Sequence, residues 1–205
     1  MEIKAVIFDY GNVLTHPQSS EYINKMLKIL NVDFEIFDKA YYQHRDLYDG
    51  GKVTGIEYWQ LVSQSLNAQI LNKEFLKNLV DIDLDSWYFQ NEQMWDLVLN
   101  LKKNYKTALL SNNLDDLVIR IERDIELNKY FDAVVFSNKV SYLKPDKRIY
   151  EYCLNLLGLR ANETIFIDDR EVNIEGANKL GINSILFKNY DQLLVELNKY
   201  GVILN

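Results

Sequence analysis

The stretch from Ile3 to Leu14, IKAVIFDYGNVL, places an unbroken apolar run directly before an acid and a glycine. The run is too continuous for a strand exposed on one face, and it predicts a strand buried on both faces of a parallel sheet. Asp9 stands where this strand ends, and Gly11 and Asn12 after it are residue types that favour a turn. Ligands of open α/β sheets bind beyond the carboxyl ends of the strands, so Asp9 is a candidate site residue. The alternative is an Asp that only caps a turn.

Five apolar runs of this kind predict buried strands. They lie at residues 3–8, 106–111, 133–136, 164–168 and 183–187. From residue 91 onward, segments with helical periodicity separate the runs, which is the pattern of a parallel sheet with helices on its faces. The sequence therefore predicts an α/β fold.

The interval between the first two strands is far longer than the dozen or so residues that a crossover helix needs. Helical spacing of apolar residues recurs there at residues 19–31, 34–48, 54–67 and 72–83. Gly50-Gly51 breaks the second segment from the third, and Thr54 with Glu57 resembles a capping box for the third. We expect a small helical module, inserted after Asp9 and lying over that strand end.

The aromatic residues of this module favour its core over contacts with a substrate. They are Tyr41, Tyr42, Tyr48, Tyr58 and Trp59. Arg45 and Lys52 could meet a second anionic group of a ligand, although exposed cations on a helical module are the default.

The formal net charge of −7 argues against nucleic acid or an anionic membrane as the main partner, but not against a small anion. The single Cys153 cannot form an internal disulfide and lies in a helix-like run, which predicts a buried thiol and a reducing compartment. We expect no leader before the first strand, and no stretch of the sequence approaches the length needed to span a bilayer. We expect a soluble cytoplasmic protein; its oligomeric state stays open, and a monomer is compatible with the sequence.

Two further polar clusters follow the second and third strands. Ser111-Asn112-Asn113 ends the second strand just before a helix that begins near Leu114. A hydroxyl and backbone N–H groups at such a turn can hold a phosphate oxygen, although these residue types also serve as plain N-caps. After the third strand, Lys144 precedes Pro145, which suits the first turn of the next helix and would hold the lysine in the connection.

The fourth strand ends in Asp168-Asp169, which is the strongest signal in the chain. Adjacent carboxylates repel each other and resist desolvation, and a hard cation such as Mg²⁺ removes that penalty. Asp9 would complete the ligand set; the alternative is two solvated acids in a loop. The next helix carries residues small or polar enough to let it pack close under the site: Asn173, Gly176 and Ala177.

Four segments, in order, resemble the four motifs of the haloacid dehalogenase (HAD) superfamily, and the resemblance covers essentially the whole chain. They are FDYGNV (8–13), LLSNN (109–113), LKPD (143–146) and FIDDREVNIEGANKLG (166–181). The helical insertion also stands at the usual position of a cap. The resemblance implies a Rossmann-like core made of residues 1–15 and 88–205, and a helical cap made of residues 16–87.

The resemblance also implies Mg²⁺-dependent hydrolysis of a small phosphorylated metabolite through an aspartyl-phosphate. Asp9 would be the nucleophile that attacks phosphorus, and water would then hydrolyse the covalent intermediate. Ser111 and the backbone around Asn112 would bind the transferring phosphoryl group. Lys144 would offset charge on the phosphate and on Asp9. Mg²⁺ would be held by Asp9, the carbonyl of Gly11, Asp168 and Asp169, with the choice of a direct ligand among the last two left open.

Gly11 departs from the superfamily pattern, because most of its phosphatases have a second Asp there that protonates the leaving group and later activates water. General acid–base assistance of about 10²- to 10⁴-fold is thereby in question. Asn12 cannot replace it because an amide does not titrate near neutrality, which leaves His16 or a cap residue such as His44. We therefore expect a leaving group that needs little proton help, such as that of a sugar 1-phosphate. The FDxGNV form resembles that of the α-glucose-1-phosphatase branch.

Two alternatives stay open. A 2-haloacid dehalogenase also uses an Asp nucleophile without the second Asp, but it needs no metal, so the pair Asp168-Asp169 weighs against it. A catalytically weak binding module would account for Gly11, but it has no need for a desolvated anionic cluster.

Overall fold

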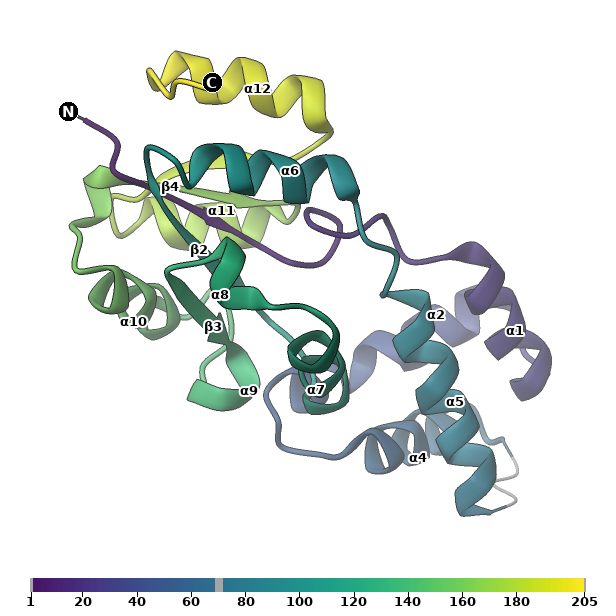
Figure 1. The fold of residues 1–205 in the computed structure, drawn as a ribbon. Helices are drawn as coiled ribbons and strands as arrows, with labels where there is room; N and C mark the ends of the chain where they lie inside the picture. The colour runs from purple at the N-terminus through teal and green to yellow at the C-terminus, as the bar shows by residue number, and fades with distance from the viewer. Residues whose placement is uncertain (1, 69–71, 205) are drawn as a thin grey trace.

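The computed structural model describes residues 2–68 and 72–204. A five-stranded parallel sheet lies at its centre, with the spatial order β3-β2-β1-β4-β5 (Figure 1). The strands are β1 (Ala5–Phe8), β2 (Lys106–Ser111), β3 (Ala133–Phe136), β4 (Thr164–Asp168) and β5 (Asn183–Leu186). Each lies within one of the five apolar runs, so the predicted α/β fold is confirmed.

The strand order explains why the first run is apolar throughout. β1 is the central strand, and Ala5 pairs with Lys106 of β2 on one side and with Thr164 of β4 on the other. All four residues of β1 are buried. The chain leaves β1 in one direction through β2 and β3 and later returns to build β4 and β5 on the other side. The switch point of the sheet, where ligands of such folds bind, therefore lies at the end of β1.

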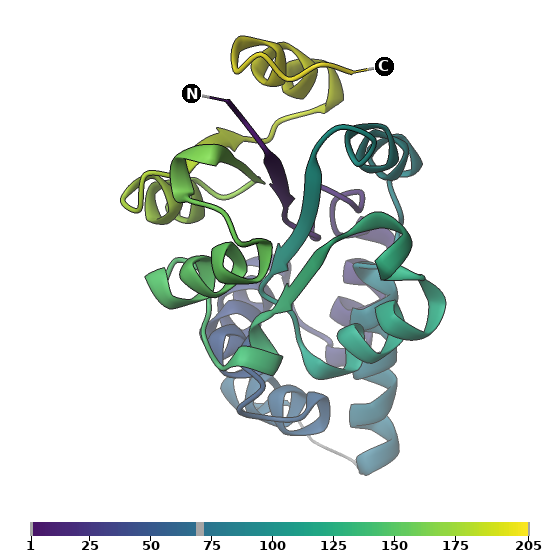
Figure 2. The same cartoon turned by 60° about the vertical axis from the view of Figure 1, so that its left-hand side comes forward.

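Helices cover both faces of this sheet, and Figure 2 shows the two layers on opposite sides. One apolar layer packs the sheet against α6 (Glu92–Leu101), α7 (Asp115–Asp124), α8 (Leu127–Tyr130) and α12 (Tyr190–Lys199). The other packs it against α10 (Lys147–Leu157) and α11 (Glu171–Asn178). The short helix α9 (Ser137–Val140) and a 3₁₀ helix (Ala161–Glu163) complete the core.

Among the described residues, five helices lie between β1 and α6, and Figures 1 and 2 show them gathered at one end of the molecule. They are α1 (Ser20–Leu30), α2 (Phe34–Gln43), α3 (Arg45–Asp49), α4 (Gly55–Ser65) and α5 (Lys73–Ser86). The helical insertion is thus present, and the capping box of Thr54 and Glu57 is confirmed. The single helix predicted over 34–48 is wrong, because the backbone leaves the helical region at His44 and starts again as α3.

The aromatic residues of the insertion divide into two groups. Tyr41, Tyr48, Tyr58 and Trp59 are buried in its core, as expected. Tyr42 is 53% exposed instead, so it is free to contact a ligand.

The connection after β3 differs from its prediction. Pro145 does not lie in the first turn of the next helix: α10 begins at Lys147, and the side chain of Asp146 caps it by accepting a hydrogen bond from Arg148 N at 3.0 Å. Lys144 still lies in the connection, ahead of a cis peptide bond to Pro145. The helix expected near Leu114 is confirmed as α7.

The structure also bears on the expectations for Cys153 and for membrane-spanning helices. Cys153 is a buried free thiol in α10, as predicted. Among the described helices, none combines the length and the apolar character that crossing a bilayer requires.

Candidate active site

A cavity of about 530 Å³ lies where the strand ends meet the inserted helices. Six of the predicted site residues line it: Asp9, Gly11, Ser111, Asn112, Lys144 and Asp169. Asp168, the seventh, is fully buried and bonds to Lys144. The structure therefore brings together side chains from three strand ends and from the loop before α10.

Asp9 is nearly buried, and its two oxygens differ in their surroundings. Oδ1 accepts a hydrogen bond from Tyr10 N at 2.7 Å and lies 2.8 Å from the ammonium of Lys144. Oδ2 has no hydrogen-bond partner among the residues that the structure describes. Burial raises the pKa of Asp9 to about 7; Lys144 opposes the rise, and Asp168 and Asp169 add to it. One carboxylate oxygen is thus anchored and the other is left for a ligand.

Lys144 joins two carboxylates while itself out of contact with water. Its ammonium lies 2.8 Å from Asp9 Oδ1 and 2.6 Å from Asp168 Oδ2, and its side chain is 1% exposed. Burial alone would lower the pKa of Lys144, but Asp168 and Asp9 outweigh it, so the pKa is raised. The lysine is therefore charged near neutral pH and can face a phosphate without being neutralised.

Asp168 and Asp169 differ in how many hydrogen bonds they accept from the protein. Asp168 accepts hydrogen bonds from Lys144 Nζ, from Asn173 Nδ2 at 3.0 Å and from Arg170 N at 2.8 Å. Asp169 accepts from Asn12 Nδ2 at 2.8 Å. Burial raises the pKa of Asp169, which Asn12 opposes and Asp168 reinforces. Asp168 is occupied by donors of the protein, whereas Asp169 keeps an oxygen for an ion.

The three carboxylates of this cluster have oxygens within 4.8 Å of one another. When all three are ionised, their negative charges exceed the single positive charge of Lys144 by two, and burial raises the pKa of Asp9 and of Asp169 accordingly. Carboxylate oxygens are also the donors that Mg²⁺ prefers. In charge and in donor type, the residues present fit a divalent cation.

Ser111 lies at the end of β2 with 2% of its surface exposed. Its Oγ accepts a hydrogen bond from Asn113 Nδ2 at 3.3 Å, which leaves the hydroxyl proton available for a phosphate oxygen. Asn113 N donates in turn to Ser137 Oγ at 2.9 Å. The side chain of Asn112 bonds to the backbone of Lys144, so only its backbone remains for a ligand.

The position of Gly11 is open. A Cβ built there would meet only the ring of Trp87, at 4.0 Å. Neither histidine considered as a substitute acid lines the cavity, and the His44 ring bonds to Ser65 Oγ at 3.1 Å on an exposed surface. Nothing at the strand end itself therefore takes the place of the missing second Asp.

The inserted helices add five residues to the cavity wall: Tyr42, Arg45, Asp46, Asp49 and Trp87. Of the two cations considered from the sequence, Arg45 lines the cavity and Lys52 does not. Asp46 and Asp49 were not predicted from the sequence, although Asp49 stands directly before the break at Gly50-Gly51, as Asp9 stands before its own turn. No sequence signal marks Trp87.

The guanidinium of Arg45 is tied to the inserted helices. Its Nε donates to Asp49 Oδ1 at 2.9 Å, and Nη1 donates to the hydroxyl of Tyr41 and lies 3.4 Å from Asp83 Oδ2. Two carboxylates thus share this one cation, so Arg45 brings little free positive charge to the cavity.

A family model described as haloacid dehalogenase-like hydrolase matches residues 3–181 of the chain. Among curated proteins, bifunctional epoxide hydrolase 2 of Sus scrofa is 37% identical over 114 residues, which is 53% of this chain and 20% of that protein. The match thus spans about a fifth of this relative's length, and the corresponding proteins of Mus musculus and Rattus norvegicus are matched over 23% and 18% of theirs.

Two bacterial relatives carry different activities in their names. The (S)-2-haloacid dehalogenase 4A of Burkholderia cepacia is 28% identical over 135 residues, or 63% of this chain and 58% of that protein. The D-ribitol-5-phosphate phosphatase of Bacteroides thetaiotaomicron is 25% identical over an alignment that covers 99% of each chain.

The fold is also that of solved structures. A HAD family enzyme from Bacteroides thetaiotaomicron, in complex with magnesium and inorganic phosphate, superposes with a TM-score of 0.75 at 21% identity, covering 93% of this chain and 98% of that one. At this level of identity the likeness establishes the fold.

Proposed function

The chain belongs to the haloacid dehalogenase-like hydrolases, and we propose that it is a Mg²⁺-dependent phosphatase that hydrolyses a small phosphomonoester through an aspartyl-phosphate. One observation carries the proposal: Asp9 has one oxygen anchored by Lys144 and the other without a partner among the described residues, within a cluster of three carboxylates that share this single cation. Such a cluster needs a cation, and a cation beside a free carboxylate oxygen is what attack on a phosphate requires.

Each residue has a role in this reaction. Asp9 Oδ2 attacks phosphorus while the bond to the leaving oxygen breaks, and water then displaces the phosphoryl group from Asp9. Lys144 favours the ionised form of Asp9, orients it and balances charge on the phosphate. Ser111 Oγ and the backbone N–H groups after it donate to phosphate oxygens.

The Mg²⁺ ligands follow from the hydrogen bonds already made. Asp9, Asp169 and the carbonyl of Gly11 would hold the ion directly. Asp168 would reach it through water, because its oxygens already accept from Lys144, Asn173 and the backbone. The bound ion would neutralise the carboxylates so that an anionic substrate can approach.

We assign residues 16–87 to a cap domain and residues 1–15 and 88–205 to the catalytic core. The cap would exclude water during transfer and select the substrate, since it supplies Tyr42, Asp49 and Trp87 to the cavity wall. The cavity of about 530 Å³ has the size of a pocket for a small metabolite. A single buried thiol fits a cytoplasmic location.

The substrate that we propose is a sugar phosphate, and above neutral pH a sugar 1-phosphate in particular. The open position at Gly11 supports this choice, because the anomeric oxygen leaves more readily without a proton than an ordinary alkoxide does. The name of the relative that aligns over 99% of both chains, a phosphatase of D-ribitol 5-phosphate, supports the broader sugar and polyol class.

The dehalogenase alternative has one observation in its favour, the relative from Burkholderia cepacia. Against it stands the excess negative charge around Asp9, which has no purpose in a reaction without a metal. The negative charge argues less strongly against a binding module, because such a module could use it to bind Mg²⁺ together with phosphate without hydrolysing any ester.

The decisive experiment measures phosphate release from a panel of esters, with sugar 1- and 6-phosphates included, in Mg²⁺ and in a chelator, for the wild type and Asp9→Asn. Metal-dependent turnover that disappears in Asp9→Asn supports the proposal, and the panel ranks the substrates. A clear preference for 6-phosphates above neutral pH would refute the sugar 1-phosphate. Chloride release from a 2-chloro acid in the chelator would favour the dehalogenase, and phosphate binding without turnover would favour the binding module.

A further inference from the structure

We propose that Asp49, which reaches the cavity from the inserted helices, is the proton donor to the leaving group and then the base for the attacking water. The inference rests on the proposed phosphatase function and assigns a task that Gly11 leaves without a residue. Asp49 would thus supply, from the end of α3, the general acid and base that the turn after β1 lacks.

Asp49 meets the first requirement, which is position. It lines the same cavity as Asp9 and the phosphate-binding residues. It is the last residue of α3, and its Oδ1 accepts a hydrogen bond from Arg45 Nε at 2.9 Å. Its Oδ2 has no hydrogen-bond partner among the described residues, so one oxygen can carry a proton to a ligand while the other stays anchored.

The backbone of Asp49 is fastened to the core beside the phosphate-binding turn. Ser137 Oγ donates to the carbonyl oxygen of Asp49 and accepts from Asn113 N at 2.9 Å. Asn113 is two residues after Ser111, so a single hydroxyl links the proposed acid to the segment that would hold the phosphate. The carboxyl group is therefore held in place before any substrate binds.

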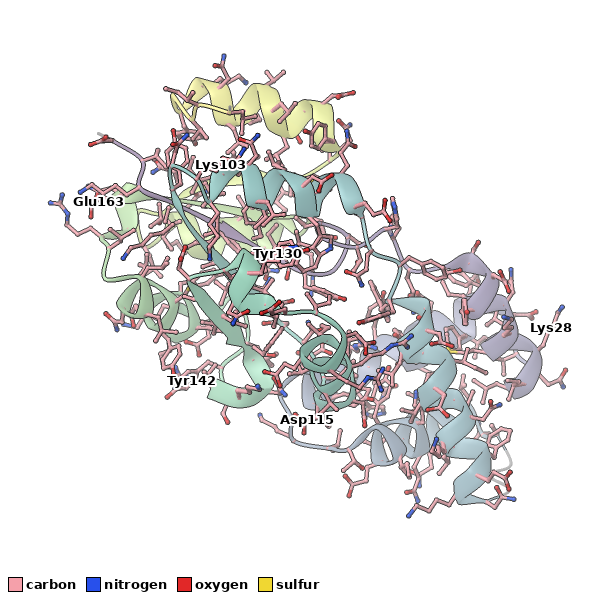
Figure 3. The ribbon with its side chains drawn as sticks, in the orientation of Figure 1. Lys28, Lys103, Asp115, Tyr130, Tyr142 and Glu163 are labelled. Atoms are coloured by element: carbon pink, nitrogen blue, oxygen red, sulfur yellow. The ribbon has the colours of Figure 1, made fainter. Side chains whose placement is uncertain are left out.

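Two neighbouring contacts hold the end of α3 and the loop that follows it against the core. Tyr48 Oη donates to Asp116 Oδ2 of α7 at 2.9 Å. Gly51 has a φ of +65°, and a Cβ there would lie 3.2 to 3.4 Å from atoms of Asn138. Figure 3 labels Asp115 at the start of α7, on the side of the core that this loop contacts. A loop so closely applied to the core can place a proton donor reproducibly.

The titration of Asp49 agrees with this role. Burial raises its pKa to about 6; Arg45 lowers it, while Asp83 and Asp46 raise it further. The charged and polar groups around it are Arg45 and Asp46 of α3, Tyr41 of α2 and Asp83 of α5. A carboxyl group of this kind is present in both protonation states near neutrality, as a general acid and base must be.

The chemical steps balance. As Asp9 Oδ2 bonds to phosphorus, the bond from phosphorus to the leaving oxygen breaks and that oxygen takes the proton of Asp49, which gives a neutral alcohol. In the second step the Asp49 carboxylate takes a proton from water as the water oxygen bonds to phosphorus and the bond to Asp9 breaks. Free phosphate leaves, and Asp49 is again protonated.

The test compares substrates that differ only in their need for a proton. p-Nitrophenyl phosphate releases a stable phenolate, whereas a sugar 6-phosphate releases an alkoxide. For Asp49→Asn we expect kcat/KM for the sugar 6-phosphate to fall by about 10²- to 10⁴-fold and that for p-nitrophenyl phosphate to change little. The matched control is Asp81→Asn, which alters an acid of α5 whose side chain is 55% exposed and does not line the cavity, and which should change neither.

The pH profile gives a second readout that a merely structural residue would not move. In the wild type, kcat/KM for the 6-phosphate should fall as the pH rises through the pKa of Asp49, because the acid form is lost. In the wild type, the ratio of kcat/KM for the 6-phosphate to kcat/KM for the 1-phosphate should therefore rise as the pH falls. In Asp49→Asn this ratio should not depend on pH.

Several results would overturn the inference. Equal losses of kcat/KM on both substrates would make Asp49 a structural or binding residue, and an unchanged kcat/KM for the 6-phosphate would exclude it from proton donation. A retained kcat/KM for p-nitrophenyl phosphate shows at the same time that the variant is folded. If the wild type hydrolyses neither ester in Mg²⁺, it is the phosphatase proposal that fails, and this outcome differs from a selective loss in Asp49→Asn.

Discussion

Asn112 and Lys144 are joined by two hydrogen bonds that run in opposite directions. Lys144 N donates to Asn112 Oδ1 at 2.8 Å, and Asn112 Nδ2 donates to Lys144 O at 3.0 Å. The side-chain amide of Asn112 therefore satisfies both backbone polar groups of Lys144, as the backbone of a paired strand does. It couples the turn after β2 to the loop that supplies the cation of the site.

Asn112→Ala should lower kcat/KM and stability together, because it removes both bonds and leaves the backbone of Lys144 unpaired. Loss of partners for buried polar groups costs about 1–3 kcal/mol. Urea denaturation and phosphatase assays would check this. The control is Asn155→Ala, which changes an exposed asparagine of α10 and should be neutral. A variant at Asn112 with wild-type activity would contradict the positioning role.

Lys144→Met should destabilise the protein, because it leaves Asp9 and Asp168 buried and close together without their shared cation. Removing one partner of a buried ion pair costs about 3–5 kcal/mol. Mg²⁺ should recover part of this loss by supplying positive charge to the same carboxylates, so the urea midpoint of the variant should depend more on Mg²⁺ than that of the wild type.

The control for this change is Lys147→Met. The side chain of Lys147 is 70% exposed and lies 3.7 Å from Glu151, and pairs of this kind contribute about 0–1 kcal/mol. A midpoint for Lys144→Met that did not respond to Mg²⁺ at all would argue against a metal site among these carboxylates.

Gly176→Ala should destabilise the protein even though alanine is the better helix former by about 1 kcal/mol. The new Cβ would lie 2.7 Å from Pro145 Cβ and 3.1 Å from both Pro145 O and Tyr150 Oη. Overpacking of this kind costs about 1–3 kcal/mol. The clash also displaces the loop that carries Lys144, so activity should fall with stability.

Gly11→Ala provides the comparison, because its Cβ would meet only the Trp87 ring at ordinary contact distance, 4.0 Å. We expect this variant to fold like the wild type. Thermal melts of the two variants side by side would decide; an unchanged melting temperature for Gly176→Ala would mean that the close approach of α11 is not required.

Cys153 should resist thiol reagents in the native protein. It is fully buried in α10, and burial raises the pKa of its thiol to about 12, so the reactive thiolate is scarce. Labelling measured against urea concentration should follow global unfolding. Fast, complete labelling in native buffer would show that α10 opens locally.

The sheet and the residues at its strand ends could be predicted from the sequence because their signals are local. Continuous apolar runs marked all five strands, and the polar residues at their ends, such as Asp9, Ser111 and Asp169, meet in space because parallel strands end at one edge. The concentration of negative charge at Asp168 and Asp169 could likewise be predicted, because the two residues are adjacent in the sequence.

The wall that the inserted helices contribute could not be predicted in the same way. Asp49 reaches the cavity because the end of α3 docks on the core through Tyr48 and Ser137, and no periodicity encodes that docking. Trp87 follows α5 and donates to the hydroxyl of Tyr41 at 3.0 Å, a contact between distant segments that no sequence pattern indicates. The break at His44 was missed since the apolar spacing continues through it. Pro145 was misplaced because Asp146, a better capping residue, sets the start of α10.

The position of β1 at the centre of the sheet has a consequence for synthesis of the chain. Ala5 pairs with Lys106 and Thr164, so β1 has neither of its neighbouring strands until a hundred residues have followed it. All the helices from α1 to α6 are made in that interval. Long-range pairing of this kind slows folding, and an apolar strand that waits for its partners is open to aggregation. A strand that is buried throughout in the finished enzyme is thus, during synthesis, an apolar segment that a chaperone could protect.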